Sequence, residues 1–397
     1  MALAERLERL GTETAFAVSL AAAEWGAKGN RIFPFHLGDL NIATPQNVVD
    51  AMNKAIKDGK TGYCPAAGIP QLREALAEDV GSRRGLNFAP ANVVVQPGGK
   101  PVITKFIQTV MNPGEEVLYP NPGYPIYESQ IEYFGGVAKS YRYIPSSTGF
   151  NIDLDHLKSQ ITSKTKAIIY NDLQNPIGAE STDAEREAIA EIAIKHNLWV
   201  LSDEAYFEMR YSGTSKSIAS LPGMLERTVI LYTFSKKFAM TGWRIGYIGA
   251  PEWIAKACTK FQSNFTSGAN SIAQRACKAA VESDPSKVNY MVEKFAYRRE
   301  KMVAWMKEIP GFELETPPGA FYVFPRITAL LGKKFNGQVL ETALDVSMYL
   351  LEEGLVSTVP GDAFGLPGYI RFSYAAAEAE LEEAVKRVKV AVANLED

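Results

Sequence analysis

The chain contains few of the residues that build disulfides or metal centres. Its 397 residues include three cysteines and three histidines. The cysteines Cys64, Cys258 and Cys277 are odd in number and lack the spacing of metal ligands. The histidines are scattered along the chain. We therefore expect neither a disulfide framework nor a metal site.

Long apolar runs and an excess of positive charge are also missing. No stretch approaches the roughly 20 apolar residues that a membrane-spanning helix needs. The N-terminal segment mixes acidic and basic residues, unlike the positive beginning of a signal peptide. A formal net charge of -3 provides no basic stripe for nucleic acid. We expect a cytoplasmic protein without a membrane or nucleic-acid partner, in which 46% hydrophobic residues suffice to fill two domains.

Apolar runs alternate with helical patterns through the first part of the chain. A helix is predicted over residues 181–197, and Thr182 and Glu185 have the spacing of a capping box at its start. Strands with little polar patterning inside them favour a mostly parallel sheet covered on both faces, which is an α/β domain. The predicted strands begin the segments 91–111, 115–125 and 165–178 and lie within 198–206, 228–236 and 242–250.

The pattern changes from about Asp284 onward. A long helix is predicted over residues 288–309, and short strands between helices follow it, which indicates a smaller α+β domain. We expect the N-terminal arm to pack there. The predicted division is an N-terminal arm with part of the small domain (1–45), a large domain (46–284) and a small C-terminal domain (285–397).

The strand ends of the predicted sheet carry polar residues. Ligands of parallel sheets bind beyond the carboxyl ends of the strands. The ends here read "GGK", "NPGYP", "NDLQNPIG", "SDEAY" and "TFSK". Glycines at a helix start, together with Thr233, Ser235 and Arg244, suit a phosphate, because a helix N-terminus favours an anion and a guanidinium binds two oxygens.

A lysine beside a phosphate site has a chemical use that a lone surface lysine lacks. Its amine can form a Schiff base with a carbonyl cofactor, and an acidic partner at a pyridinium nitrogen is the protein's contribution to pyridoxal-phosphate chemistry. Asp203 can be that partner. Asn175 and Tyr206 can donate hydrogen bonds to a ring oxygen, and Tyr124 can stack on the ring. Each residue alone has a purely structural interpretation, but the combination at strand ends favours the cofactor.

The chain resembles the fold-type I pyridoxal-phosphate aminotransferases, in particular the bacterial aspartate aminotransferase branch, over nearly its whole length. The resemblance implies a large α/β domain with a mostly parallel seven-stranded sheet covered by helices, a smaller α+β domain and a homodimer. The motifs that carry it occur in the family's order and are "YCPAAGIPQLREALA", "GGK", "NPGYPIY", "NPIG", "SDEAY", "SKKFAMTGWRIGY", "SIAQRA", "PPGAFYVF" and "IRFSYA".

The resemblance also assigns roles to residues. It identifies Lys236 as the Schiff-base lysine, with Asp203 and Tyr206 as its catalytic partners, and we interpret Lys237 as a neighbour on the surface. The cofactor contacts that it implies are Gly99, Lys100, Tyr124, Asn175, Asp203, Tyr206, Thr233, Ser235, Lys236 and Arg244, with Tyr63 reaching the site of the other subunit. The substrate contacts that it implies are Gly38, Lys100, Tyr124, Asn175 and Arg371, of which Arg371 would hold the α-carboxylate.

Two departures from the family pattern limit what the resemblance implies; the first leaves the reaction open, and we expect a small effect of the second. The run Gly38, Asp39, Leu40 and Asn41 replaces a usual Gly-Glu-Pro-Asp, and Ile177 replaces a usual threonine. A lyase, cyclase or decarboxylase on the same scaffold is therefore an alternative to an aminotransferase. A ligand-sensing module without activity is a third hypothesis, although the chain has no helix-turn-helix extension or basic patch.

Lys100 bears on the substrate. A cation at a helix N-terminus is slightly unfavourable and needs a compensating anion. In the bacterial branch a lysine at this position meets the distal carboxylate of dicarboxylic amino acids. We therefore expect aspartate or glutamate as amino donor and 2-oxoglutarate or oxaloacetate as acceptor.

Overall fold

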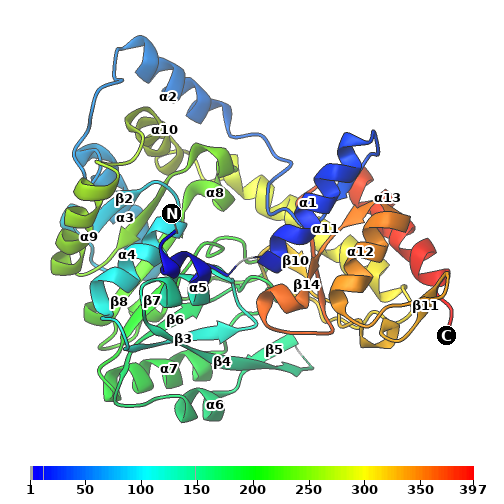
Figure 1. Cartoon of the computed structure of the whole chain (residues 1–397). Helices are drawn as coiled ribbons and strands as arrows, with labels where there is room; N and C mark the ends of the chain where they lie inside the picture. The colour runs from blue at the N-terminus through cyan, green and yellow to red at the C-terminus, as the bar shows by residue number, and fades with distance from the viewer. Residues whose placement is uncertain (1–2, 12, 148) are drawn as a thin grey trace.

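An eight-stranded sheet organises the first part of the chain (Figure 1). The computed structural model describes residues 3–11, 13–147 and 149–397. The pairs β8–β7, β7–β6, β6–β3 and β3–β4 are parallel, whereas β2–β9, β9–β8 and β4–β5 are antiparallel. In sheet order the strands are β2 (Val93–Gln96), β9 (Gly246–Gly249), β8 (Thr228–Thr233), β7 (Trp199–Asp203), β6 (Thr165–Asn171), β3 (Glu116–Asn121), β4 (Val137–Ser146) and β5 (Gly149–Ile152).

The expected α/β architecture is confirmed, and the sheet has one strand more than the seven expected. The additional strand is β5, which turns back from β4 and pairs with it at the edge of the sheet. Most residues of β4 are exposed or half-buried, so this hairpin lacks the continuous apolar run of a central strand. The inner strand β8 is buried along its whole length, as expected of a strand that is covered on both faces.

Helices cover both faces of this sheet. Alternate residues of β8 divide between them: Val229 and Leu231 pack with α4 and α9, whereas Ile230 and Tyr232 pack with α3 and α10. The capping box of Thr182 and Glu185 starts α7 as predicted. The helices of this part are α2 (Gln46–Lys57), α3 (Pro70–Arg84), α4 (Lys100–Val110), α5 (Ile126–Tyr133), α6 (Leu154–Ser159), α7 (Asp183–Lys195), α8 (Phe234–Lys237), α9 (Glu252–Phe265) and α10 (Ser271–Val281).

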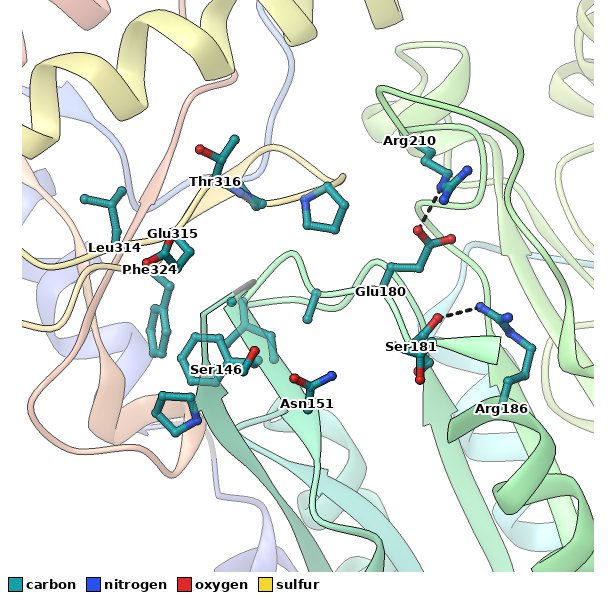
Figure 2. Close-up of a pocket in the computed structure, with 18 of the residues that line it drawn as sticks. Ser146, Asn151, Glu180, Ser181, Arg186, Arg210, Leu314, Glu315, Thr316 and Phe324 are labelled. Carbon is teal, nitrogen blue, oxygen red and sulfur yellow. Dashed lines mark hydrogen bonds and ion pairs between the residues drawn. The ribbon is translucent and has the colours of Figure 1, made fainter. Parts of the chain in front are cut away.

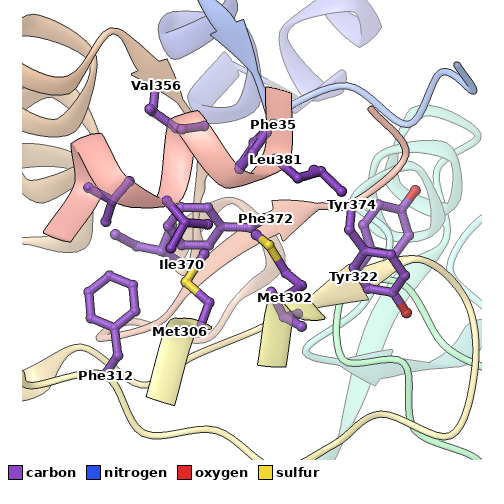
Figure 3. Close-up of a cluster of buried hydrophobic side chains, with 14 of the residues drawn as sticks. Phe35, Met302, Met306, Phe312, Tyr322, Val356, Ile370, Phe372, Tyr374 and Leu381 are labelled. Atoms are coloured by element: carbon purple, nitrogen blue, oxygen red, sulfur yellow. The ribbon is translucent and has the colours of Figure 1, made fainter. Parts of the chain in front are cut away.

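The C-terminal part has its own apolar core (Figure 3). Met302 and Met306 on α11 lie beside Phe372 of β15 in this core. The predicted long helix is present as α11. The elements are α11 (Ser286–Lys307), α12 (Ala343–Gly354), α13 (Glu378–Ala393), the sheet of β10 (Tyr322–Val323), β15 (Ile370–Ser373) and β14 (Val359–Pro360), and the hairpin of β11 (Lys334–Phe335) and β12 (Gln338–Val339).

The N-terminal segment packs against the C-terminal part, as expected. Strand β1 (Phe33–Pro34) pairs in parallel with β13 (Val356–Ser357), and α1 (Glu13–Ala27) contacts α12 and β14 (Figure 1). The domain limits at 45/46 and 284/285 stay a prediction. Among the described helices, none combines the length and apolar character that crossing a membrane requires.

A tight junction joins the two parts beside the carboxyl edge of the large sheet. The Ala320 N–H donates to the Met209 carbonyl at 3.0 Å. Gly178 has φ +65°, and a Cβ there would lie 2.7 Å from the Pro317 Cβ and 2.9 Å from the Gly319 carbonyl oxygen. Only glycine fits this contact without displacement. The junction leads directly into β10, which carries Tyr322 to the edge of the sheet.

Candidate active site

A cavity of about 580 Å³ lies at the carboxyl ends of the central strands. Its lining combines residues that follow β3, β6, β7 and β8 with residues of the N-terminal segment and of the C-terminal part. The cavity brings together all but one of the predicted site residues. The predicted residues that line the cavity are Gly38, Gly99, Lys100, Tyr124, Asn175, Asp203, Tyr206, Thr233, Ser235, Lys236, Arg244 and Arg371.

Lys236 is the cation at the floor of the cavity. It lies on α8, whose first turn is capped by the Thr233 Oγ1, which accepts from the Ser235 N–H at 3.2 Å. The Lys236 Nζ donates to the Gly38 carbonyl at 2.7 Å. Burial in the first place, together with the charges of Arg371 and Arg244, lowers the pKa of Lys236 to about 8, although the charge of Asp39 acts against this shift. Its amine therefore loses its proton far more readily than that of an exposed lysine.

Asp203 is a buried carboxylate that ends β7 and is 6% exposed. Its Oδ2 accepts from the Tyr127 hydroxyl at 2.7 Å, and its Oδ1 accepts from the Ala205 N–H at 3.2 Å. Burial raises the pKa of Asp203 to about 6, in spite of these two hydrogen bonds. The site therefore offers a carboxylate that a buried cation, such as a protonated ring nitrogen, would stabilise.

Donors for an anion gather at the opposite end of the cavity. Gly98 has φ +103°, and a Cβ there would lie 2.3 Å from the Arg244 Nη2, so a side chain at this turn would displace the guanidinium. The Thr233 and Ser235 hydroxyls lie 2.9 Å apart beside the turn. Burial and the charge of Arg244 lower the pKa of Lys100. Two cations beside a glycine turn form a cradle that suits an anion.

Arg371 supplies a second anion-binding group on the other side of the cavity. Its Nη1 donates to the Asn175 Oδ1 and its Nη2 to the His36 carbonyl, both at 2.8 Å. Its guanidinium lies 4.4 Å from the centre of the Tyr322 ring. The buried Nε has no hydrogen-bond partner among the described residues. A carboxylate would therefore find a buried, positioned guanidinium here, and the Asn175 amide group keeps its Nδ2 free to donate into the cavity.

Two cavity residues were missed from the sequence. Tyr322 lies with its hydroxyl 2.8 Å from that of Tyr206, and Tyr127 donates to Asp203. Tyr322 is part of the motif "PPGAFYVF", and Tyr127 follows Tyr124 by one helical turn. The helical spacing was a usable signal for Tyr127. No local pattern pointed to Tyr322, because the junction described above brings it to the site.

The surface position expected for Lys237 is wrong. The residue is 5% exposed, and its Nζ lies 3.7 Å from the Glu208 Oε1 and 4.0 Å from the Asp79 Oδ1. Lys237 points away from the cavity because it follows Lys236 at a short helical turn. It belongs to a set of three carboxylates and three cations, here called the rear charge cluster, of which Glu204, Arg84 and Lys237 are buried and Asp79, Glu208 and Arg83 are half-buried.

Tyr63 is the predicted site residue that lies outside the cavity. Its side chain is 100% exposed, in the loop that precedes α3. The loop lies beside residues 266–272, which join α9 to α10. Within one chain this tyrosine therefore contributes nothing to the cavity.

A second cavity, of about 620 Å³, lies beyond the Gly178 junction (Figure 2). Each basic side chain in its lining is already paired with a carboxylate within the described part of the chain. The pairs are Arg210 with Glu180, Arg186 with Asp172 and Asp183, Lys216 with Asp183, and Arg326 with Glu313. This cavity is slightly larger, but its cations are neutralised, whereas Lys236 and Arg371 of the first cavity form no ion pair with a carboxylate among the described residues, so the first cavity is the candidate active site.

Comparison with known proteins gives the family. A family model described as aminotransferase class I and II matches residues 32–388. A probable aspartate/prephenate aminotransferase of Aquifex aeolicus is 36% identical, over 99% of this chain and 99% of its own. The crystal structure of an aspartate aminotransferase from Rhizobium meliloti superposes with a TM-score of 0.95 at 32% identity, covering 100% of both chains. An alanine aminotransferase of Pyrococcus furiosus gives 0.91 at 28% identity, covering 99% of this chain and 100% of its own.

These relatives favour transfer of an amino group over the lyase, cyclase, decarboxylase and sensor hypotheses. The match covers almost the entire chain, including the strand-end residues that form the cavity. The chain belongs to the class I and II aminotransferases and is an aminotransferase built on the fold of the aspartate aminotransferases.

Proposed function

We propose that the cavity binds pyridoxal 5'-phosphate and that the protein transfers the amino group of a dicarboxylic amino acid to a 2-oxo acid. The observation that carries the proposal is the convergence of Lys236, Asp203 and Arg371 on one cavity. Lys236 offers an amine of lowered pKa, and Asp203 a buried carboxylate without an ion pair in the part of the chain that the structure describes. Arg371 offers a buried guanidinium whose Nε has no partner there. These groups fit this cofactor and an amino-acid substrate.

The cofactor contacts follow from the groups present. The Gly98–Gly99 turn, Thr233, Ser235 and Arg244 would hold the phosphate, and Lys236 would hold the cofactor covalently as a Schiff base. Asp203 would hold the proton of the ring nitrogen. Asn175 and Tyr206 would donate to the ring oxygen, and Tyr124 would cover the ring. When bound, the cofactor supplies the carbonyl that accepts the amino group and the electron sink that stabilises the deprotonated substrate.

Lys236 is the proton carrier of the proposed reaction. Its neutral Nζ would accept the α-proton of the substrate and would later donate this proton again in the same cavity. Burial in the cavity favours the neutral amine that this task needs. The Gly38 carbonyl, 2.7 Å from the Nζ, orients the amine.

The substrate would be held at both ends. Arg371 would bind the α-carboxylate, assisted by the Gly38 backbone. Lys100 lines the rim of the cavity and would bind the distal carboxylate of aspartate or glutamate. This assignment predicts 2-oxoglutarate or oxaloacetate as the acceptor.

We further propose a cytoplasmic homodimer. The complete exposure of Tyr63 in the single chain suits a residue that contacts the phosphate in the partner subunit's site. The composition suits a cytoplasmic protein, since the chain has few cysteines and no excess of positive charge.

A half-reaction with single amino acids tests this function. The holoenzyme is mixed with aspartate, glutamate, alanine or phenylalanine, and the absorption change that accompanies transfer of the amino group to the cofactor is followed. We expect the fastest change with the dicarboxylic substrates. Borohydride reduction followed by peptide mapping should place the cofactor on Lys236, and a label on Lys237 would contradict the assignment.

Lys100→Ala separates the substrate role from a cofactor role. Lys100 is exposed in the single chain, and a hydrogen bond to a charged group contributes about 1.5–3 kcal/mol, so kcat/KM with aspartate should fall by at least about tenfold. Efficiency with alanine should change much less, since alanine has no second carboxylate. Lys256→Ala, which removes an exposed lysine of α9, is the matched control. Equal losses on all substrates would assign Lys100 to the cofactor or the fold.

A further inference from the structure

A buried lysine outside the active site connects the strand end before the Gly98–Gly99 turn with the helix that holds the segment around Ala66. Lys105 on α4 is 4% exposed. Its amine donates to the Oε1 of Gln96 and to the Oε1 of Gln262. It forms no ion pair with a carboxylate in the described ranges 3–11, 13–147 and 149–397. A buried lysine bound by amide oxygens is costly to keep, so its position calls for a role.

The two glutamines belong to different elements. Gln96 ends β2 and stands just before the Gly98–Gly99 turn. Gln262 lies on α9 and is fully buried, and its Nε2 donates to the Ala66 carbonyl at 2.9 Å and to the Val95 carbonyl at 2.5 Å. The Lys105 amine therefore links the start of the phosphate cradle to the segment around Ala66.

The segment 64–69 is fitted closely onto β2. The Val95 N–H donates to the Ala67 carbonyl at 2.9 Å, and the Ile69 N–H donates to the Gln274 Oε1 at 2.8 Å. Gly68 has φ +110°, and a Cβ there would lie 2.5 Å from the Val95 Cγ2. Tyr63 precedes this segment directly. Its backbone position therefore depends on how the segment sits on β2.

Lys105 fixes the orientation of both amide groups. A lysine amine only donates, so each glutamine must turn its Oε1 toward Lys105. The Nε2 of Gln262 then points at the carbonyls of Ala66 and Val95. The Ala66 and Val95 carbonyls favour the same orientation of the Gln262 amide, because a turned amide would present its oxygen to two carbonyl oxygens, and the Lys105 amine reinforces this orientation by donating to the Oε1.

We propose that Lys105 is a positioning residue that holds the glycine cradle of its own site and, through Gln262, the Tyr63 segment that serves the partner subunit's site. One buried amine thereby supports phosphate binding in both sites of a dimer. The inference rests on the proposed cofactor and dimer.

Lys105→Met tests the proposal in the apo protein and in the holoenzyme. Met keeps the volume and removes the donors. In the apo protein we expect faster amide hydrogen exchange within residues 64–69 and 96–99 and unchanged exchange in α7. In the holoenzyme the Kd for pyridoxal phosphate should rise about tenfold, the effect of losing hydrogen bonds, with kcat at saturating cofactor nearly unchanged. Lys256→Met on α9 is the control of equal charge change.

Gln262→Glu separates the effect of Lys105 on the segment 64–69, through Gln262, from its effect on residues 96–99, through Gln96. Glutamate keeps an acceptor for Lys105 but removes both donations to the Ala66 and Val95 carbonyls. Exchange should then rise within 64–69 and stay slow within 96–99. This variant also keeps the proposal falsifiable if Lys105→Met does not fold, because equal loosening of both segments or of neither would contradict the link.

A hybrid dimer tests the effect across the interface. One chain carries Lys105→Met together with Lys236→Ala, and the other chain is unmodified. The cavity of the unmodified chain is then the one that contains an intact Lys236, and its cofactor binding is measured. We expect weaker cofactor binding at that site than in a hybrid carrying Lys236→Ala alone. Equal binding in the two hybrids, or uniformly faster exchange throughout Lys105→Met, would overturn the proposal. If the unmodified protein binds no pyridoxal phosphate, the proposed function fails, whereas the exchange measurements still test Lys105.

Discussion

At the residue scale, Asp39 has a direct electrostatic effect on Lys236, and it keeps the negative charge of the glutamate that the family pattern has at this position. It lines the cavity, its carboxylate accepts a hydrogen bond from the Thr241 hydroxyl, and its charge raises the pKa of Lys236. Burial and two arginines lower the same pKa to about 8. Asp39 therefore keeps the amine protonated over a wider pH range than the rest of the site would.

Asp39→Asn should shift the cofactor-binding profile toward lower pH. Only the neutral Lys236 amine attacks a carbonyl, so the rate at which the apo protein binds pyridoxal phosphate should rise with pH, with a midpoint near pH 8. Removing the negative charge lowers this midpoint and speeds binding near neutral pH. Thr241→Val, which leaves the charge in place, is the control. A midpoint that stays in place or moves upward would refute the role of Asp39.

The same pKa has a consequence for the stability of the apo protein. An unfolded lysine has a pKa near 10.5, so between about pH 8 and 10.5 the unfolded chain binds more protons than the folded one at Lys236. Lys236 therefore increases the free energy of unfolding as the pH rises from about 8 to 10.5.

The sequence predicts the residues that meet the ligand better than the residues that support them. Lys236, Asp203 and Arg371 could be found because each belongs to a distinctive motif, although only Asp203 ends a strand, whereas Lys236 lies on α8 and Arg371 lies within β15. Tyr127 acts on Asp203 across 76 positions, and Tyr322 acts on Tyr206 across 116. Such pairings arise from the folding of distant segments, so the spacing from Tyr124 could have pointed to Tyr127 as a cavity residue but not to Asp203 as its partner, and no local pattern pointed to Tyr322.

At the element scale, the rear charge cluster anchors the two segments that carry the catalytic residues. Glu204 follows Asp203 in β7, and its Oε2 accepts from the Arg84 Nε at 2.5 Å. Lys237 follows Lys236 in α8 and lies between the carboxylates of Glu208 and Asp79. The last turn of α3 supplies the arginines, so this helix holds the back of both segments.

Lys237→Met should lower the free energy of unfolding by up to about 3 kcal/mol, because it removes a buried cation and leaves Asp79 and Glu208 with Arg83 as their remaining cationic partner among the described residues. Adding Glu208→Gln should recover part of the loss by restoring the charge balance. Turnover per folded molecule should stay close to that of the unmodified enzyme. Urea unfolding measures the first two effects, with the exposed Lys256→Met as reference. A loss no greater than that of the reference would show that the cluster contributes little.

The sequence predicted most elements but not this cluster. Uninterrupted apolar runs identified the inner strands, and the capping box located the start of α7. The exposed hairpin of β4 and β5 gave no such run. Lys237 was misplaced because charged residues are usually exposed, and only the arrangement of α3 behind the sheet reveals a buried position with partners.

At the scale of the whole molecule, the exposed Tyr63 predicts complementation between subunits. A Lys236→Ala chain and a Tyr63→Phe chain are each impaired in their own homodimer. In a mixed dimer, the site built on the intact Lys236 of the Tyr63→Phe chain receives an intact Tyr63 from the other chain. Its Kd for pyridoxal phosphate should return to that of the unmodified enzyme.

The measurement is a cofactor titration of the purified mixed dimer. The Tyr63→Phe homodimer should bind several-fold more weakly, as expected for the loss of one hydrogen bond to a charged group. Mixed dimers that bind no better than this homodimer would contradict a contact across the interface, and so would a fully active monomer.

Asp203 and Glu204 are neighbours in the chain with side chains on opposite sides of the sheet edge, and so are Lys236 and Lys237. This arrangement has a consequence for inherited variation. Neighbouring codons encode side chains of the same charge, yet one of each pair faces the cavity and the other the rear charge cluster. A change of stability by 1–2 kcal/mol alters the amount of protein in a cell several-fold. Variants at 204 and 237 should therefore reduce the amount of protein in the cell. Variants at 203 and 236 should leave this amount unchanged and abolish the turnover of each molecule.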